Sequence, residues 1–329
     1  MRKLKVGMLS FAHGHAFSYL YELMRMPNVE VVGIADRDRE RVSAVLEQYK
    51  LPYFSDYREL IGSDVEAVII CSENAYHTEM AVEAARQGKH ILCEKPLGIG
   101  IPEMDQMIRE AKANGVQLMT AFPCRFVPAV VEAKKAIDKG EIGKVVAIRG
   151  TNRGTKPAEP WFTNKELSGG GAVLDHTVHV TDLMNWFMSD SRVCEVYALA
   201  ETLYHDIDVD DAGMVHMRYD NGVIAVLDPS WSRPKSYPTW GDVTMEIVGT
   251  EGSISVDCFK QSFDLYRDEV MKANWSYFGD SMDHYMLKAF VDAIFSDSPV
   301  PVSGEDGKLS AVVALAAYNS AALGQPVKL

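Results

Sequence analysis

A lysine and an acid follow a short apolar segment in the first third of the chain. Residues 88–96 read Gly-Lys-His-Ile-Leu-Cys-Glu-Lys-Pro, so Glu94 and Lys95 come directly after a predicted strand at His90–Cys93. Open α/β sheets hold ligands at the carboxyl ends of their parallel strands, and a lysine at that edge is a candidate catalytic group. The alternative is a surface lysine that pairs with Glu94, since exposed ion pairs are common and contribute little.

A second set of polar residues lies in the other half of the chain. The run Gly169–Gly171, whose lack of side chains would let the backbone pass close to a ligand, leads into an apolar helical segment that contains Asp175, His179 and Asp182. Spacings of four and three residues place these side chains on one stripe of the helix. Burying such a stripe is costly unless it is fully hydrogen-bonded or takes part in chemistry, and we favour chemistry. His176 points about 100° away from Asp175 and is either a pocket-lining or a structural residue.

The turn after the first predicted strand has the context of a dinucleotide site. It joins a strand to a helix, where a pyrophosphate would rest on backbone amides and the helix dipole. Aligned on the GxGxxG spacing, Ser10, Ala12 and His15 replace the three glycines, and Gly14 comes one position early. Small side chains at Ser10 and Ala12 still let the backbone approach a phosphate. The predicted pyrophosphate site is Ser10, Phe11, Ala12, His13, Gly14 and His15.

An acid at the end of the second predicted strand strengthens this interpretation. Asp36 lies about 20 residues further along, where a carboxylate bonds the ribose hydroxyls of an adenosine. A 2′-phosphate about 4 Å from that carboxylate would be repelled by roughly 1–4 kcal/mol, which predicts a preference for NAD. Arg37 would soften the preference by holding the phosphate, so NADP is the alternative cofactor. The alternative for Asp36 is a solvated turn acid.

His13 and His15 raise the question of a metal site. Two histidines in a tight turn, with no carboxylate or thiolate at ligand spacing, more often donate to phosphate or begin a helix. We therefore predict no metal there.

A further polar turn follows the predicted strand Ala67–Cys71 and opens a helix. Its polar groups, Ser72 and Asn74, lie at a carboxyl edge from which they can reach a nicotinamide ribose. His77, in the first helical turn, either joins them or only caps and packs.

Alternating elements position the residues of the first half. From Leu4 to about Phe122, short β-branched runs alternate with amphipathic stretches of helical period, which predicts βαβ units and a doubly wound parallel sheet over residues 1–122. The predicted strands are Lys5–Leu9, Glu30–Ala35, Ala67–Cys71, His90–Cys93 and Gln117–Thr120. The predicted helices are Ala16–Met26, Arg39–Tyr49, Thr78–Gln87 and Glu103–Ala113.

The second half has a different pattern, which predicts an α+β domain with an open, mostly antiparallel sheet over residues 123–329. Asp220–Gly222 and Gly249–Gly252 are strong hairpin signals between alternating segments. The predicted strands are Lys144–Arg149, Cys194–Thr202, Met214–Tyr219, Val223–Asp228, Val243–Val248 and Ser253–Asp257. The predicted helices are Val127–Lys139, Gly171–Phe187, Met282–Phe295 and Gly307–Leu323.

Composition narrows the class of protein. The 329 residues are 47% hydrophobic and 24% charged, which is typical of a folded protein with two domains. No apolar stretch approaches the roughly 18–20 residues of a membrane span, and the sequence after Met1 does not read as a secretion signal. The five cysteines are scattered and lack metal-ligand spacing, which predicts reduced thiols in a cytoplasmic protein. A formal charge of −13 argues against nucleic acid as a partner.

Several motifs together resemble one known family. Glu94-Lys95-Pro96, the turn Ser72-Glu73-Asn74 with His77, the glycine run before Asp175 and His179, and the two-domain layout resemble the glucose-fructose oxidoreductase, inositol dehydrogenase and MocA (Gfo/Idh/MocA) family over nearly the whole chain. The resemblance implies an N-terminal Rossmann domain for NAD(P). It also implies a C-terminal open sheet that builds homodimers or homotetramers, and sugar or cyclitol substrates.

The resemblance also implies roles for individual residues. Lys95 would contact the nicotinamide ribose and the reacting hydroxyl, His179 would exchange the substrate proton, and Asp175 would orient substrate or base. Asp36 would hold the adenosine ribose. Arg125 with Phe126, and Trp161 with Phe162, fall where the family lines its substrate pocket, although either pair could equally be packing. Two departures are Glu73, where the family usually has proline, and the missing glycines of the first turn.

Together with the resemblance, these residues imply reversible hydride transfer between nicotinamide and a secondary alcohol or ketone, and the resemblance implies that the substrate is a sugar, sugar derivative or cyclitol. Histidine changes its charge near neutral pH, so His179 is preferred over Asp175 as the base. A redox-neutral glycoside hydrolase or lyase that uses bound NAD is a second interpretation. A nucleotide-sensing regulator without turnover is the third, and it is disfavoured because Lys95 and His179 are both present.

Overall fold

The computed structural model describes residues 2–329, and the chain forms two compact units. Unit 1 comprises the described part of Met1–Pro123 together with Glu166–Gly169 and Asp283–Lys308. Unit 2 comprises Cys124–Lys165, Gly170–Met282 and Leu309–Leu329. The predicted boundary after residue 122 lies beside the first change of unit. The sequence pattern did not indicate that two later segments join unit 1.

Unit 1 contains a six-stranded parallel sheet in the order β3-β2-β1-β4-β5-β6. Its strands are β1 Leu4–Leu9, β2 Val29–Ala35, β3 Tyr53–Phe54, β4 Ala67–Ile70, β5 His90–Cys93 and β6 Leu118–Thr120. The order reverses between β1 and β4, which is the switch point where doubly wound sheets hold ligands. The predicted Rossmann-type fold of the first half is therefore confirmed.

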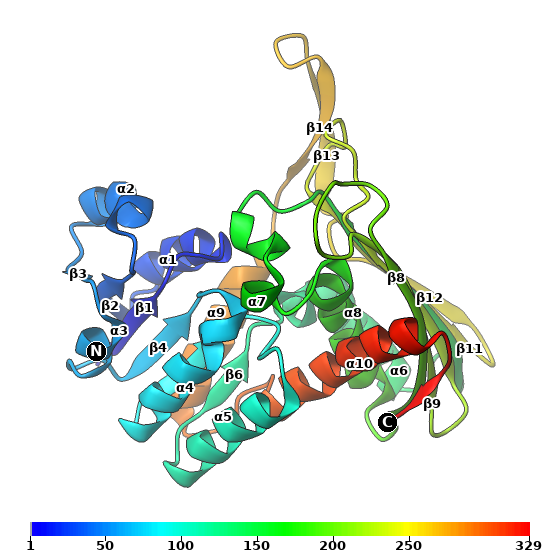
Figure 1. The fold of residues 1–329 in the computed structure, drawn as a ribbon, viewed down its shortest axis with the longest axis horizontal. Helices are drawn as coiled ribbons and strands as arrows, with labels where there is room; N and C mark the ends of the chain where they lie inside the picture. The colour runs from blue at the N-terminus through cyan, green and yellow to red at the C-terminus, as the bar shows by residue number, and fades with distance from the viewer. Residues whose placement is uncertain (1) are drawn as a thin grey trace. The chain divides into compact units, whose positions relative to one another are not determined.

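Helices follow most strands of unit 1, as the 3.6-residue period predicted. They are α1 His15–Arg25, α2 Arg39–Tyr49, α4 His77–Arg86 and α5 Ile101–Ala113, with the 3-10 turn η1 Asn74–Tyr76. Unit 1 also contains the short helix α3 Tyr57–Ile61, which was not predicted, and most of α9 Met282–Ser296, which comes from far along the chain. Asp38 caps α2 by accepting the backbone N–H groups of Glu40 and Arg41. In Figure 1, α4 and α5 run side by side along the sheet.

Unit 2 contains a seven-stranded sheet in the order β12-β11-β7-β10-β9-β8-β15. Its strands are β7 Val145–Gly154, β8 Val193–Glu201, β9 Ala212–Tyr219, β10 Ile224–Ser230, β11 Gly241–Gly249, β12 Ser253–Asp257 and β15 Val327–Lys328. All neighbours are antiparallel except β7 and β10, which pair in parallel. Both predicted hairpins, β9–β10 and β11–β12, are confirmed.

The sheet of unit 2 has one covered face and one open face. The helices α6 Pro128–Asp138, α8 Ala172–Met188 and the C-terminal part of α10 Gly304–Leu323 contribute to the apolar core on the covered face. Along β9, Val215, Met217 and Tyr219 are buried in that core, whereas the alternating residues Met214, His216 and Arg218 are exposed. The open face is thus a surface of mixed apolar and charged side chains.

Several short elements were missed in the sequence. The strand β3 has two residues and α3 has five, which is too short for a period to show. A separate hairpin, β13 Ser262–Arg267 with β14 Lys272–Tyr277, extends away from the large sheet in Figure 1. The 3-10 turns η2 Pro123–Phe126 and η3 Pro160–Thr163 and the short helix α7 Lys165–Ser168 were also not predicted.

Candidate functional site

The first turn of unit 1 bends without the expected glycine. Ser10 follows β1 with φ = 66°, a left-handed conformation that glycine usually supplies at little cost. Its backbone N–H donates to the Ala35 carbonyl at 2.7 Å, and its hydroxyl oxygen accepts the Ala12 N–H at 3.2 Å. A serine thus fills the position of the first glycine, and its own side chain stabilises the turn.

Asp36 holds this turn against the end of β2. Its carboxylate accepts the Phe11 N–H at 2.7 Å and the Asp38 N–H at 2.7 Å, and the Arg41 guanidinium lies 3.3 Å away. The residue is only 3% exposed. The solvated-acid alternative is therefore wrong. Arg41 was missed in the sequence, although its position five residues after Asp36 on α2 was a usable signal.

The residues around Asp36 fit an adenosine ribose. A cavity there is lined by Ser10, Arg37, Arg41, Tyr57 and Glu73 among others. Buried polar groups that already have hydrogen bonds on one side and border a cavity on the other are suited to bind a polar ligand. Arg37 is engaged elsewhere, since its guanidinium lies 3.1 Å from Glu79 and 4.5 Å from the ring centre of Tyr76.

A buried carboxylate joins the two histidines of the turn. His15 Nδ1 lies 3.0 Å from Glu94 Oε1, and the backbone N–H of His15 donates to His13 Nδ1 at 3.2 Å. The ligand atoms of His13, His15 and Glu94 lie within 4.8 Å of one another. The sequence showed no carboxylate at ligand spacing because Glu94 comes from β5, far along the chain. Two imidazoles and a carboxylate are donors that suit zinc, but an ion pair satisfies them equally, and the absence of a metal stays a prediction.

Charges around this group shift the pKa values. Burial is the largest influence on Glu94 and acts to raise its pKa, but His13, His15 and Lys95 outweigh it and hold the pKa well below the usual range. Burial likewise disfavours a charged His15, but Glu94 outweighs burial and raises the pKa of His15. The arrangement favours a cationic imidazole beside an ionised carboxylate at the predicted pyrophosphate site.

This ion pair predicts that NADH binds less tightly as the pH rises. A protonated His15 attracts the pyrophosphate, and because Glu94 raises the pKa of His15, the positive charge persists to higher pH than on an ordinary imidazole and is lost as the pH rises through that raised pKa. Glu94, Lys95 and Asp283 are the other charged groups that act on His15. We expect the Kd of NADH from a fluorescence titration to rise about fivefold between roughly pH 6.5 and 9. His15→Gln should flatten the profile, and an unchanged profile in that variant would contradict the assignment.

The turn after β4 is built from backbone contacts. Asn74 Nδ2 donates to the Ser168 carbonyl at 2.8 Å, and the Ser72 hydroxyl donates to the Glu73 carbonyl at 3.1 Å. The two ring nitrogens of His77 lie 3.0 Å from the Pro96 carbonyl and 3.3 Å from the Ser72 carbonyl. Burial lowers the pKa of His77. His77 is therefore a neutral, packed residue, which matches the second alternative.

Lys95 is buried at the carboxyl end of β5. The residue is 4% exposed, and its backbone N–H donates to the Glu94 carboxylate at 3.1 Å. The alternative of a surface lysine is therefore wrong. A buried lysine at the carboxyl edge of the sheet, beside the dinucleotide turn and one strand away from the switch point, is the strongest catalytic candidate in unit 1.

Helix α8 carries the candidate groups of unit 2. Asp175 and His179 are both 8% exposed. The Trp231 indole N–H donates to the Asp175 carboxylate at 3.3 Å, and His176 Nε2 lies 3.3 Å from the same oxygen. Trp231 was not singled out in the sequence, because its role depends on a contact between the end of β10 and α8, 56 positions apart in the chain. The helix thus brings a hydrogen-bonded carboxylate and an imidazole onto one stripe.

The glycine run before α8 has a structural reason. A Cβ on Gly171 would lie 1.9 Å from the Asp210 carbonyl oxygen, so no other residue fits there. The Asp210 carboxylate accepts the Gly171 and Val173 N–H groups at 3.0 and 2.7 Å. We predicted that a ligand lies close to the glycine backbone, but it is the backbone of Asp210 that lies there.

Asp182, the third member of the stripe, is occupied by Arg125. The guanidinium binds the carboxylate in bidentate fashion, with both N–O distances 2.6 Å, and both residues are buried. Arg125 also lies over the Trp186 ring at 5.6 Å. Trp161 and Phe162 stack at 3.9 Å and are 7% and 6% exposed, which favours packing for that pair.

Removing Arg125 should destabilise unit 2 strongly. Arg125→Ala would leave the Asp182 carboxylate buried without its ion-pair partner, and we expect the free energy of unfolding to fall by about 3 kcal/mol in urea melts. The double variant Arg125→Met/Asp182→Leu removes both charges and should regain most of the loss. A loss below about 1 kcal/mol in the single variant would show that the pair contributes little.

Comparison with known proteins places these features in a family. Residues 6–122 match the model of an oxidoreductase family with an NAD-binding Rossmann fold, and residues 130–255 match the GFO/IDH/MocA C-terminal domain. The chain is 33% identical to myo-inositol 2-dehydrogenase of Thermotoga maritima over 84% of this chain and 84% of that protein. It is 30% identical to YrbE, an uncharacterized oxidoreductase of Bacillus subtilis, over 94% of this chain and 92% of that protein.

Solved structures agree with this assignment. The structure of levoglucosan dehydrogenase in complex with NADH and levoglucosan superposes with a TM-score of 0.85 at 26% identity, and the match covers 100% of this chain and 99% of that one. Within residues 2–329, the structure holds no helix with the length and apolar content of a bilayer span. The dinucleotide turn, the buried lysine and the matches to both domains agree, and the chain belongs to the GFO/IDH/MocA family of NAD-binding oxidoreductases.

Proposed function

We propose that this protein is an NAD-dependent dehydrogenase that oxidises a secondary alcohol of a sugar, sugar derivative or cyclitol, in a reversible reaction. The observation that carries the proposal is Lys95, a lysine buried at the carboxyl end of β5 beside the dinucleotide turn. Two relatives, a myo-inositol 2-dehydrogenase and a levoglucosan dehydrogenase, support a polyhydroxylated ring as the substrate class.

Three side chains, His179, Lys95 and Asp175, have separate roles in the proposed reaction. When bound, the nicotinamide accepts or returns hydride at C4. His179 removes the proton of the reacting hydroxyl as the hydride leaves the same carbon, which is worth roughly 100- to 10,000-fold in rate for a well-placed base. The Lys95 ammonium stabilises the developing alkoxide oxygen. Asp175, whose carboxylate is fixed by Trp231 and His176, orients the substrate or the base.

The cofactor contacts follow from unit 1. Ser10–His15 would hold the pyrophosphate, Asp36 the adenosine ribose, and the edge formed by Asn74, Glu94 and Lys95 the nicotinamide side. Arg37 is paired with Glu79, and Arg41 beside the site is already paired with the Asp36 carboxylate, so a 2′-phosphate would have to displace one of these partners to gain a cation. NAD is therefore the preferred cofactor over NADP.

A substrate screen tests the proposed function. Sugars, cyclitols and their keto forms are incubated with NAD or NADP, or with the reduced forms, and the absorbance of NADH or NADPH is recorded. Oxidation of a ring polyol with NAD in preference to NADP is the expected result. Equal or tighter binding of NADPH would show that Asp36 does not select the cofactor. A blank screen with both cofactors would favour a regulator, and turnover without net NADH would favour the redox-neutral reaction.

The open sheet face of unit 2 is proposed as a contact between copies of this chain. Tyr197, Leu199, Met214 and Ile224 are large exposed apolar side chains on that face, and a hollow of about 460 Å³ lies among its strands. Arg149 pairs with Glu246, and Arg218 with Glu195, so the charges of the face are largely compensated. A homodimer or homotetramer would bury this surface, and light scattering would show the oligomeric state.

A further inference from the structure

A partly exposed tryptophan lies beside α8 in unit 2. Trp240 has 44% of its surface exposed, although its ring packs edge-on against Phe259 at a centroid distance of 5.5 Å. Its carbonyl accepts the Thr155 N–H at 2.6 Å. The ring also lies on Gly154, where a Cβ would come within 3.0 Å of the indole. The indole is therefore fixed by its neighbours and still partly open to a ligand.

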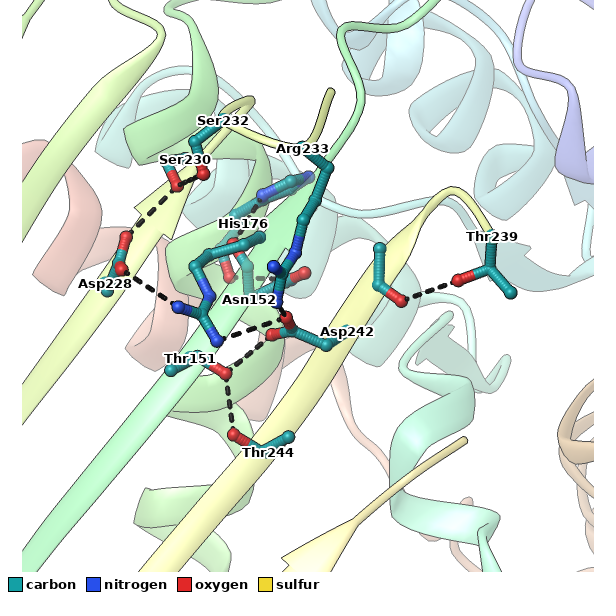
Figure 2. A network of polar contacts seen from close by, with 12 residues as sticks. Thr151, Asn152, His176, Asp228, Ser230, Ser232, Arg233, Thr239, Asp242 and Thr244 are labelled. Carbon is teal, nitrogen blue, oxygen red and sulfur yellow. Dashed lines mark hydrogen bonds and ion pairs between the residues drawn. The ribbon is translucent and has the colours of Figure 1, made fainter. Parts of the chain in front are cut away.

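This ring is next to the candidate catalytic helix. The ring centres of Trp240 and His176 are 6.1 Å apart. His176 Nδ1 lies 2.7 Å from the Asn152 carbonyl, which fixes the imidazole, and its Nε2 lies 3.3 Å from the Asp175 carboxylate. Figure 2 shows His176 and Asn152 together beside the strands that carry the polar network. A ligand on the exposed part of the indole is thus separated from Asp175 by one imidazole.

The charged groups near Trp240 compensate one another. In Figure 2, the Arg233 guanidinium reaches Asp242, which also accepts the Thr151 hydroxyl at 2.6 Å. The neighbouring Arg153 lies 3.3 Å from Asp242 and 3.9 Å from Asp228. Two guanidinium groups therefore face two carboxylates. To bind here, a carboxylate or phosphate on a ligand would have to displace Asp242 or Asp228 from its guanidinium partner. These four charged residues therefore favour a neutral ligand.

We propose that Trp240 is the platform on which the apolar face of a neutral six-membered ring substrate stacks. This inference deepens the proposed dehydrogenase function and rests on it for the identity of the reaction. The face of an indole ring is electronegative and attracts the positively polarised C–H bonds of a polyol ring. The hydroxyls at the ring edge remain free to hydrogen-bond polar groups of α8, and the His176 imidazole lies 6.1 Å from the indole, measured between ring centres.

The platform selects for ring stereochemistry. A ring whose hydroxyls are all equatorial, such as scyllo-inositol or β-D-glucopyranose, presents only C–H bonds along its two faces. Levoglucosan carries its hydroxyls in axial positions, so oxygen atoms would stand between its ring and the indole. Trp240 should therefore contribute to the binding of the first two compounds and little to that of levoglucosan.

The test compares Trp240→Ala and Trp240→Phe with the parent enzyme, and uses Tyr266→Ala, which removes a 74% exposed aromatic side chain of β13, as a control. Binding of each of the three compounds to the NAD complex is titrated by isothermal titration calorimetry, because the variants lack the Trp240 fluorophore. The ligand-induced quench of intrinsic fluorescence is recorded alongside, and KM and kcat are measured for the compounds that are oxidised. We expect Trp240→Ala to weaken binding of the equatorial rings about tenfold and Trp240→Phe about threefold. In Trp240→Ala, NADH affinity and levoglucosan binding should change less than twofold, and Tyr266→Ala should change none of these quantities by more than twofold.

Each other outcome is decisive. Unchanged binding of the equatorial rings in Trp240→Ala would overturn the platform. An equal loss for all three compounds, or a loss of NADH affinity, would assign Trp240 a structural role and overturn it too. If the parent enzyme oxidises none of them but Trp240→Phe removes a ligand-induced quench, the platform stands and the proposed dehydrogenase function fails. No turnover together with no Trp240-dependent quench would refute both.

Discussion

His179→Ala should lower kcat about a thousandfold while the Kd of NADH stays within twofold of the parent value. The variant removes the proposed base from α8, and a positioned base is worth roughly 100- to 10,000-fold. The dinucleotide turn belongs to unit 1 and is not altered. Steady-state oxidation of the best substrate from the screen measures the first quantity, and NADH fluorescence measures the second.

The control for this variant is Thr177→Val on the same buried helix. Thr177 is 0% exposed, and its hydroxyl oxygen has no hydrogen-bond partner within residues 2–329, so the change tests general damage to α8. Its kcat should remain within about threefold of the parent. Near-normal turnover in His179→Ala would move the base role to Asp175, and Asp175→Asn would then carry the large loss.

Lys95→Met should lower kcat several hundredfold. The substitution keeps most of the side-chain volume but removes the ammonium that stabilises the developing alkoxide, and loss of one such donor costs about 100- to 1,000-fold. Lys95→Arg should recover little activity, because a planar guanidinium cannot take the place of a compact ammonium in a buried site. Rates are compared at saturating NAD, so that any loss of cofactor affinity is separated from the loss in turnover.

Lys112→Met on α5 is the matched control for Lys95, since this lysine is exposed. It should retain full turnover. If Lys95→Met retained more than about a tenth of the parent kcat, the ammonium would not stabilise the transition state, and the proposed function would lose its main support.

The sequence predicted those features that depend on local pattern. The alternation of β-branched runs with amphipathic stretches predicted the parallel sheet, and Asp220–Gly222 predicted the hairpin between β9 and β10. Asp36 could be picked out as a candidate ligand of the adenosine ribose because the βαβ unit fixes its position relative to the first turn. In each case the signal lies within about 30 residues of chain.

Contacts between distant residues could not be predicted in this way. Glu94 and His15 are in contact but lie 79 positions apart in the chain, so the spacing of residues in the sequence could not show that a carboxylate lies beside the histidines. Arg125 and Asp182 are 57 positions apart, and their ion pair changes the meaning of the stripe on α8. The glycine run was interpreted as room for a ligand, because the approach of Asp210 is set by the fold of unit 2 and not by neighbouring residues.

The order in which the chain builds its units bears on how the protein can be dissected. Unit 1 is completed by α9, whose Met286, Leu287 and Phe290 are buried, although this helix is synthesised after almost all of unit 2. A fragment that ends near residue 122 would lack that helix and expose the apolar surface that it covers. Residues 1–122 therefore do not contain the whole of unit 1. To transfer unit 1 to another protein, α9 must be included as well, either by circular permutation of the chain or as an added segment.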